Sequence, residues 1–141
     1  MTTEQNKALT RRFAALLNAH DADGAFALCS PDFVDHAMPP GTPAGTEGSR
    51  QFFKSQFAAF PDLHAEVYDI TAEGDRVAFR VEVEGTHQGT LMGIPPTGRR
   101  VRLTIVNVDH FADGKITEHW GAMDTLGLMQ QLGVVPPPRT A

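Results

Sequence analysis

The fold is decided by residues 100–133, which read RVRLTIVNVDHFADGKITEHWGAMDTLGLMQQLG. In the first part of this stretch, Val101, Leu103 and Ile105 alternate with polar residues, which is typical of a strand with one buried face. Asp113-Gly114 then predicts a two-residue hairpin turn, because glycine adopts a positive φ without steric cost. The chain is therefore expected to fold back at this turn and to pair two strands.

The second part of the stretch predicts a return strand followed by a helix. The return strand covers residues 116–123. Asp124 can cap the helix, and Gly133 is expected to end it just before Pro136.

The turn also sets which side chains share a face of the sheet. In strict register Asn107 pairs with Trp120, and partners across two strands point to the same side. The face that carries Asn107 then also carries Glu118, Trp120, Ala122 and Asp124. One β-bulge in the return strand would replace this set by Thr117, His119, Gly121 and Met123. The alternation of residues leaves both registers open.

The N-terminal part of the chain predicts two helices. Thr2 and Gln5 have the spacing of a capping box, and the first helix is expected to run to about His20. Its apolar face carries Leu9, Phe13, Leu16 and Leu17. Asp21 can cap a second, shorter helix over residues 22–29.

An extended segment, a loop and a third helix follow. Residues 33–38 predict a short strand or an extended edge, and residues 39–45, rich in proline and glycine, predict a surface loop. Thr46 can cap the third helix, which Pro61 stops. Its apolar face carries Phe53, Phe57 and Phe60.

From residue 63 onward the pattern changes to strands. Residues 63–71 and 77–84 both alternate, and the second run is the clearest strand with one buried face. Short turns join the strands, so we predict an α+β fold: a cone-shaped, curved, mostly antiparallel sheet packed on the N-terminal helices. The open end of such a cone suits a small apolar ligand. We expect one domain over residues 1–135 and a C-terminal tail over residues 136–141.

Composition narrows the possible functions. The 141 residues carry a formal net charge of -5 without a basic stripe, which argues against a nucleic-acid partner. No apolar run reaches the length of a membrane span and no signal segment opens the chain, so the expected compartment is the cytoplasm. Cys29 lies in an apolar run and is interpreted as a buried small residue. The six histidines lack the spacing of a metal motif, so no metal site is predicted.

Several motifs resemble those of the SnoaL-like polyketide cyclases. They are AFPDL at residues 59–63, THQG at 86–89, GIPPTGRR at 93–100, DGKI at 113–116, EHW at 118–120 and LGLMQQLG at 126–133. The resemblance covers nearly the whole chain in the family's order. It implies the nuclear transport factor two-like cone, usually a homodimer through the outer face of the sheet. Outward residues such as Arg80 and Glu82 can pair across the two-fold axis of such a dimer.

The resemblance also implies cofactor-free chemistry with a pocket-bound acid or base, whose pKa is suited to proton transfer by burial. The family pattern implies an aspartate directly after the residue matching Trp120, and a histidine or an acid at the position of Asn107. This chain has Gly121 and Asn107 there, and neither side chain titrates. Because the family's acid lies in the pocket, the resemblance favours the bulged register, which turns His119 and Gly121 inward.

Four residues are candidates for catalysis, each with a structural alternative. His119 can act as a base or proton shuttle near neutral pH, or lie on the outer face. Asn107 can donate to a carbonyl or enolate oxygen, or hold a neighbouring backbone group. His36 can bind a ligand carbonyl or be a structural histidine. Asp124 can replace the missing acid, although we expect it to cap the last helix.

The predicted wall of the substrate pocket consists of aromatic, aliphatic and a few polar residues. They are Phe13, Leu17, Phe53, Phe57, Phe79, His87, Met92, Ile94, Ile105, Trp120 and Gly121.

Two functions follow from the sequence. The first is a cofactor-independent enzyme that cyclises, isomerises or hydrates a polyketide-like or terpenoid-like carbonyl compound. The second is a protein that binds a small hydrophobic ligand without turnover and has lost the family's aspartate. The partner in both cases is a small carbonyl-containing molecule.

Overall fold

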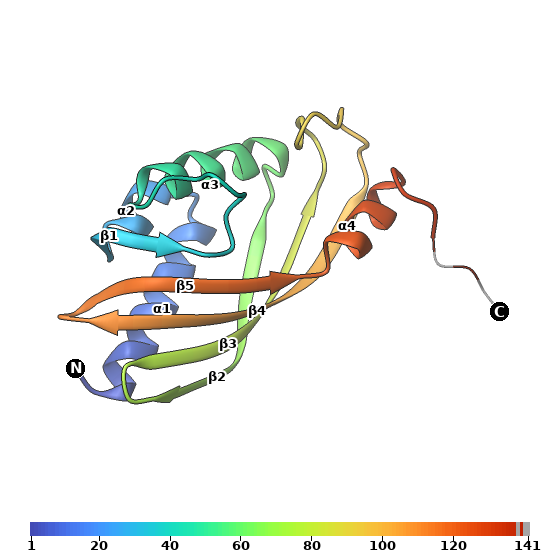
Figure 1. Cartoon of the computed structure of the whole chain (residues 1–141). Coiled ribbons are helices and arrows are strands. Elements are labelled where there is room, and N and C mark those ends of the chain that lie inside the picture. The colour runs from blue at the N-terminus through green and yellow to red at the C-terminus, as the bar shows by residue number, and fades with distance from the viewer. Residues whose placement is uncertain (138, 140–141) are drawn as a thin grey trace.

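The computed structural model describes residues 1–137 and residue 139 (Figure 1). Its elements follow the chain in this order: α1 (Thr3–Asn18), α2 (Ala22–Phe26), β1 (Cys29–Asp35), α3 (Glu47–Ala59), β2 (His64–Glu73), β3 (Arg76–Thr86), β4 (Arg100–Ala112), β5 (Lys115–Met123) and α4 (Thr125–Leu132). The predicted tail, residues 136–141, lies partly outside the described residues. Among the described helices, none is long and apolar enough to cross a membrane.

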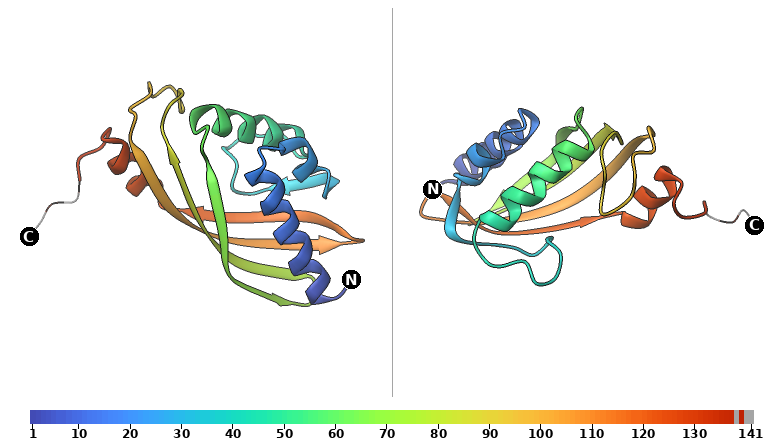
Figure 2. Two further views of the ribbon diagram at one scale, coloured as in Figure 1. Left: turned by 180° about the vertical axis from the view of Figure 1, so that it is seen from behind. Right: turned by 90° about the horizontal axis from the view of Figure 1, so that it is seen from above.

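One curved sheet holds all five strands, in the order β1-β5-β4-β3-β2. β1 runs parallel to β5, and every other neighbouring pair is antiparallel. Helices α1 and α3 lie over the concave side of the sheet, and α4 follows β5 at one end (Figures 1 and 2). The predicted α+β cone is confirmed.

The β4–β5 hairpin adopts the bulged register. Asp113 and Gly114 form the turn with φ values of 49° and 76°, as a two-residue hairpin requires. Counted from the turn, Ala112 pairs with Lys115 and Phe111 pairs with Ile116. The register then shifts by one residue, so that His110 pairs with Glu118. The extra residue is Thr117, whose hydroxyl donates to the carbonyl of His110 at 3.2 Å. The bulge therefore turns the alternate residues of β5 after it, beginning with His119, toward the concave side.

Two apolar clusters hold the helices to the sheet. Phe26 and Phe33 are buried in the first, and Leu9, Phe13, Leu16 and Leu17 of α1 pack against it as predicted. The second joins the end of α3 to α4 through Phe60, Leu128 and Leu132. Thr2 and Gln5 form the predicted capping box of α1, which fixes where this helix begins.

Some predicted boundaries are wrong. α2 ends at Phe26 rather than at Cys29, because Cys29 already belongs to β1 and pairs with Ile116. This long-range pairing extends the strand toward the N-terminus and overrides the local helical pattern. Thr46 precedes α3 without capping it, and its hydroxyl oxygen instead accepts from Nε of Arg50 at 3.1 Å.

Candidate active site

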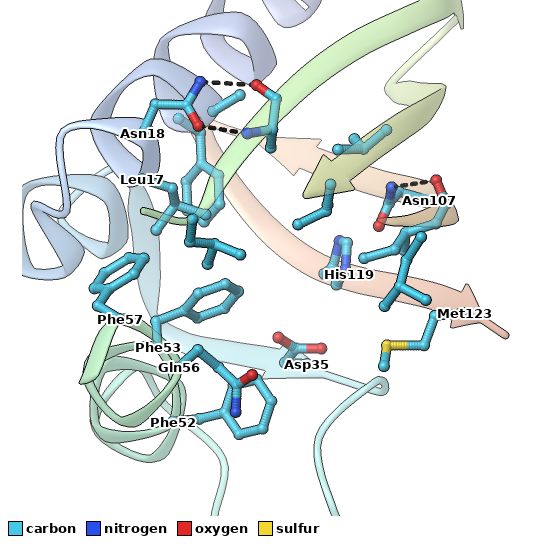
Figure 3. Close-up of a pocket in the computed structure, with 18 of the residues that line it drawn as sticks. Leu17, Asn18, Asp35, Phe52, Phe53, Gln56, Phe57, Asn107, His119 and Met123 are labelled. Atoms are coloured by element: carbon cyan, nitrogen blue, oxygen red, sulfur yellow. Dashed lines mark hydrogen bonds between the residues drawn. The ribbon is translucent and has the colours of Figure 1, made fainter. Parts of the chain in front are cut away.

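A cavity of about 240 Å³ lies between the concave face of the sheet and helices α1 and α3 (Figure 3). Most of its wall is apolar. Six of the predicted wall residues line it: Phe13, Leu17, Phe53, Phe57, Phe79 and Ile105. Such a wall binds flat or branched carbon skeletons and strengthens the electrostatic effect of the few polar groups inside it.

Three titratable side chains cross the cavity floor on neighbouring strands. His119 of β5 pairs with Asp109 of β4 on one side and with Asp35 of β1 on the other. All three line the cavity. Because residues paired across strands point to the same side, the row Asp35–His119–Asp109 forms one polar strip beneath an apolar roof.

His119 and Asp109 are joined by a short hydrogen bond. Nδ1 of His119 donates to Oδ1 of Asp109 at 2.6 Å, and the Asp109 side chain is 5% exposed. Burial opposes a charge on His119, but the hydrogen bond and charge of Asp109, together with the charge of Asp35, outweigh it and raise the pKa of His119. The bond fixes the tautomer in which Nε2 is the free basic nitrogen.

Gly121 lies where Nε2 of His119 and the amide of Asn107 converge. A Cβ atom at Gly121 would be 3.1 Å from Nε2 of His119 and 3.1 Å from Oδ1 of Asn107, so these two atoms are no more than twice that distance apart. The amide nitrogen of Asn107 donates to the carbonyl of Ile105 at 3.2 Å (Figure 3). Asn107 therefore turns its oxygen toward Gly121, and its predicted donation to substrate depends on its second N–H.

Asp35 is a cavity residue that the sequence analysis missed. Its carboxylate accepts the N–H of Ala37 at 2.9 Å. Burial raises the pKa of Asp35, although the charge of His119 and the bond from Ala37 act against this. The signal in the sequence was the period of two in β1, which puts Asp35 on the same face as buried Phe33.

Asp109 lies two residues after Asn107 and so shares its face of β4, but the sequence did not identify it as the partner of His119. The bulge brings the two residues side by side, and its position inside β5 leaves no local signature. Cys29 also lines the cavity. Burial is the largest cause that raises the pKa of its thiol to about 12, and the charges of Asp109 and Asp35 act in the same direction. It is the buried, unreactive residue that was predicted.

His36 and Trp120 lie outside the cavity, which corrects two predicted contacts. Nε2 of His36 is 2.9 Å from a carboxylate oxygen of Glu118, and its ring stacks on Trp120 at 4.5 Å. His110 approaches Trp120 from another side at 4.5 Å. Because Asp35 and His119 point inward, the residue that follows each of them points to the outer face.

Three other predicted wall residues do not line the cavity: His87, Met92 and Ile94. After Thr86 the chain leaves the sheet and crosses the end of α3, where Gly89 donates to the carbonyl of Ala59. His87 is fully buried and accepts at Nδ1 from the N–H of Thr97 at 3.2 Å. Met92 is 67% exposed at a tight turn, and Ile94 packs against the second apolar cluster.

Asp124 caps α4, as we expected, and does not replace the family's missing acid in the cavity. Its carboxylate accepts the N–H of Gly127 at 2.8 Å, and it does not line the cavity. Within the described part of the chain, no group of three or more histidine, cysteine or acidic side chains is arranged to hold a metal ion.

Comparison with known proteins finds relatives along most of the chain. The model of the SnoaL-like polyketide cyclase family matches residues 7–132. The nogalonic acid methyl ester cyclase of Streptomyces nogalater is 31% identical over 105 residues, which cover 73% of this chain and 78% of that protein. The aklanonic acid methyl ester cyclase DnrD of Streptomyces peucetius is 33% identical over 78 residues, 55% of this chain and 54% of DnrD. The chain thus spans about half the length of the aklanonic acid methyl ester cyclases that it matches.

Solved structures of similar proteins cover nearly the whole chain as well. AclR from Streptomyces galilaeus, a proposed hydroxylase, superimposes with a TM-score of 0.87 at 36% identity and covers 98% of this chain and 87% of its own. IdmH from Streptomyces antibioticus, a proposed polyketide cyclase, gives a TM-score of 0.80 at 36% identity, with coverages of 92% and 99%. These structures share the nuclear transport factor two-like fold predicted for this chain.

Proposed function

Because the chain belongs to the SnoaL-like polyketide cyclase family, we propose that it is a cyclase-type enzyme that closes a ring in a polyketide-derived carbonyl compound by an intramolecular aldol reaction. The observation that carries this proposal is the 2.6 Å bond between His119 and Asp109 inside an apolar cavity. This pair can supply the acid–base function of the aspartate that Gly121 replaces.

The proposed base is Nε2 of His119. Asp109 holds the imidazole by Nδ1, so that Nε2 can accept a proton from the carbon between two substrate carbonyls. The enolate carbon then attacks a second carbonyl of the same molecule and forms the new C–C bond. Asp109 stabilises the imidazolium that exists between the two steps, as its effect on the pKa of His119 indicates. The overall reaction is an isomerisation and needs no cofactor.

Gly121 provides the space that this arrangement needs. A side chain at position 121 would contact both Nε2 of His119 and Oδ1 of Asn107. Without it, the reacting carbon of a substrate can approach the imidazole from the side of the cavity. We therefore propose that Gly121 belongs to the substrate-binding surface and that the acid of the family has been replaced by a carboxylate on the opposite side of His119.

The substrate class is also a proposal. The relatives are named as cyclases of aklanonic and nogalonic acid methyl esters. By analogy, the substrate here is a polyketide-derived methyl ester with an acidic C–H between carbonyls. The apolar cavity wall suits the aromatic part of such a molecule.

Deuterium exchange at the acidic C–H of a substrate tests whether the protein abstracts this proton. A β-keto ester of a polyketide type is incubated with the protein in D₂O, and deuterium incorporation and ring closure are followed by NMR. We expect His119→Gln to slow both by about a hundred- to ten-thousand-fold, the usual loss for a general base. The matched control is His64→Gln, a surface histidine that pairs with Glu66 on β2.

The second candidate function is ligand binding without turnover, which the absence of an acid at Gly121 favours. It predicts that the wild-type protein binds the β-keto ester but exchanges no deuterium above the rate of buffer. In that case the enzymatic proposal fails. If His119→Gln retains the full rate, the assignment of the base fails.

A further inference from the structure

A second carboxylate, Asp35, enters the cavity and has no part in the mechanism above. It stands beside His119 on the side opposite to Asp109, since β1 and Asp109's strand β4 flank β5. Figure 3 shows its carboxylate and the imidazole of His119 pointing into the same space, with Gln56 and Met123 on the other sides of that space. A substrate that contacts His119 in this space can therefore also contact Asp35.

The two carboxylates have different bonding. Asp109 accepts a hydrogen bond from His119, and its charge is used to hold the imidazole. Asp35 accepts only the backbone N–H of Ala37 at one oxygen, and among the described residues its other oxygen has no hydrogen-bonding partner. That second oxygen is free to contact a ligand.

Asp35 is surrounded by a defined set of charged and titratable groups. These are His119 on β5, Asp109 on β4, Cys29 on its own strand and His36 directly after it. From α3 the cavity receives Phe52 and Gln56, which are uncharged. Burial and the charge of Asp109 favour the neutral carboxyl, whereas His119 and His36 favour the carboxylate.

We propose that Asp35, as a neutral carboxyl group, is the general acid of the reaction and donates its proton to the carbonyl oxygen that is attacked. This inference rests on the proposed function, in which His119 is the base. Two neighbouring groups that point into one cavity then divide the acid and base roles between them.

The proton balance closes over one turnover. His119 takes a proton from the substrate carbon, and the electron pair of that C–H bond becomes the enolate. As the enolate carbon bonds to the second carbonyl carbon, the C=O π pair moves to oxygen, which takes the proton of Asp35. The product hydroxyl then relays a proton from His119 to Asp35, which restores both groups. No external oxidant or reductant is needed.

The active form therefore contains one proton shared between Asp35 and His119. Removing this proton at high pH leaves no acid, and adding a second proton at low pH leaves no base. Turnover is expected to follow a bell-shaped pH profile whose two apparent pKa values belong to the pair.

Turnover of the β-keto ester tests the acid role. In Asp35→Asn the amide donates a hydrogen bond at every pH but gives no proton, so we expect a loss of about a hundred- to ten-thousand-fold in kcat. The falling alkaline limb should disappear, which leaves activity that rises with pH as His119 becomes neutral. The control is Asp32→Asn, an exposed carboxylate on the same strand, which should keep the wild-type profile.

The outcomes separate this inference from the proposed function. If the wild-type rate rises with pH to a plateau, or if Asp35→Asn keeps full kcat and the bell shape, Asp35 is not the acid and His119 can still be the base. If His119→Gln has no effect, the base assignment fails first.

Ligand binding tests the donor without turnover. In a His119→Gln background, 2-acetylnaphthalene should bind more tightly than 2-ethylnaphthalene by about two- to tenfold, because only the ketone accepts a hydrogen bond from the carboxyl group. This preference should fade as the pH rises through the pKa of Asp35, which burial raises above the ordinary aspartate value, because the ionised carboxylate no longer donates. Adding Asp35→Asn should preserve it at all pH values, and adding Asp35→Ala should abolish it. An equal preference in all three proteins would overturn the inference.

Discussion

At the scale of single residues, the site depends on two carboxylates that sit beside the same histidine and have different surroundings. Asp109 is bonded to the imidazole, whereas Asp35 faces the cavity with one oxygen free of protein partners among the described residues. Burial raises the pKa of Asp35 and favours its neutral form, whereas Asp109 uses one oxygen to hold the imidazole by Nδ1. This difference assigns the two acids to different roles.

The first residue-scale prediction concerns the pKa of His119. In Asp109→Asn the charge and the charged hydrogen bond are lost, so burial dominates and the pKa of His119 should fall from above about 6.5 to below it. Titration of the imidazole Cε1–H resonance by NMR measures this shift, with His119→Gln to assign the signal. An unchanged midpoint would mean that Asp109 does not control the charge of His119.

The second residue-scale prediction concerns Asp124. Asp124→Ala removes the cap of α4 and should lower the free energy of unfolding by about 0.5–2 kcal/mol, while Asp124→Asn should be nearly neutral because asparagine caps as well as aspartate. Thermal unfolding and turnover are measured together. Loss of turnover in Asp124→Asn at an unchanged melting temperature would instead identify Asp124 as the base.

At the scale of elements, the bulge in β5 decides which chemistry faces the cavity. With it, His119, Gly121 and Met123 lie on the concave side, and without it Trp120 would lie there. The residues of β5 next to the bulge, Ile116, Thr117 and Glu118, are ordinary strand residues and do not reveal it. The family resemblance pointed to the bulged register, because the family's acid must lie inside.

The bulge can be tested by deletion. Removing Thr117 deletes only the extra residue, so the ladder becomes regular while His110 still pairs with Glu118 and Asp109 still pairs with His119. We therefore expect His119 to keep facing the cavity and turnover to persist. Trp120, the one tryptophan of the sequence and 36% exposed, should stay on the outer face and keep its emission wavelength. Thr117→Ala is the control, since it loses only a hydroxyl bond to His110 and should also keep both activity and emission. Loss of turnover in the deletion variant, with Trp120 emission moved to shorter wavelength, would show that the two strands pair differently once Thr117 is gone.

The sequence predicted elements better than it predicted their contacts. Alternation and capping located α1, the hairpin and α4, because those signals are local. The placement of Asp35 and His36 was missed, because it depends on the parallel pairing of β1 with β5, which is distant in sequence. The position of His87 was missed for a similar reason, since the loop after it is held by the end of α3.

At the scale of the whole molecule, the concave side of the sheet lines the cavity and the convex side is exposed. The convex face carries exposed Tyr68, Val106 and Trp120. Arg80 and Glu82, which could pair across a two-fold axis, already pair with each other at 2.6 Å, and Arg80 also contacts Asp69 at 2.8 Å. If a dimer forms through this face, its apolar side chains rather than that ion pair must supply most of the binding energy.

We still predict a homodimer through the convex face, and Val106 is the residue that tests it. Val106 is 56% exposed at the middle of the sheet, on the side away from the cavity, so a charge there would be desolvated in an interface without affecting the fold of the monomer. Light scattering is measured at tens of micromolar, on the order of ordinary assay concentrations. The wild type should give about twice the chain mass of 15.3 kDa, and Val106→Glu should give the mass of one chain.

The control is Gln51→Glu, which adds the same charge on the exposed side of α3 and should remain a dimer. Turnover should persist in the Val106→Glu monomer, because every titratable group of the site comes from one chain. A wild-type protein that already scatters as a monomer would rule out the interface.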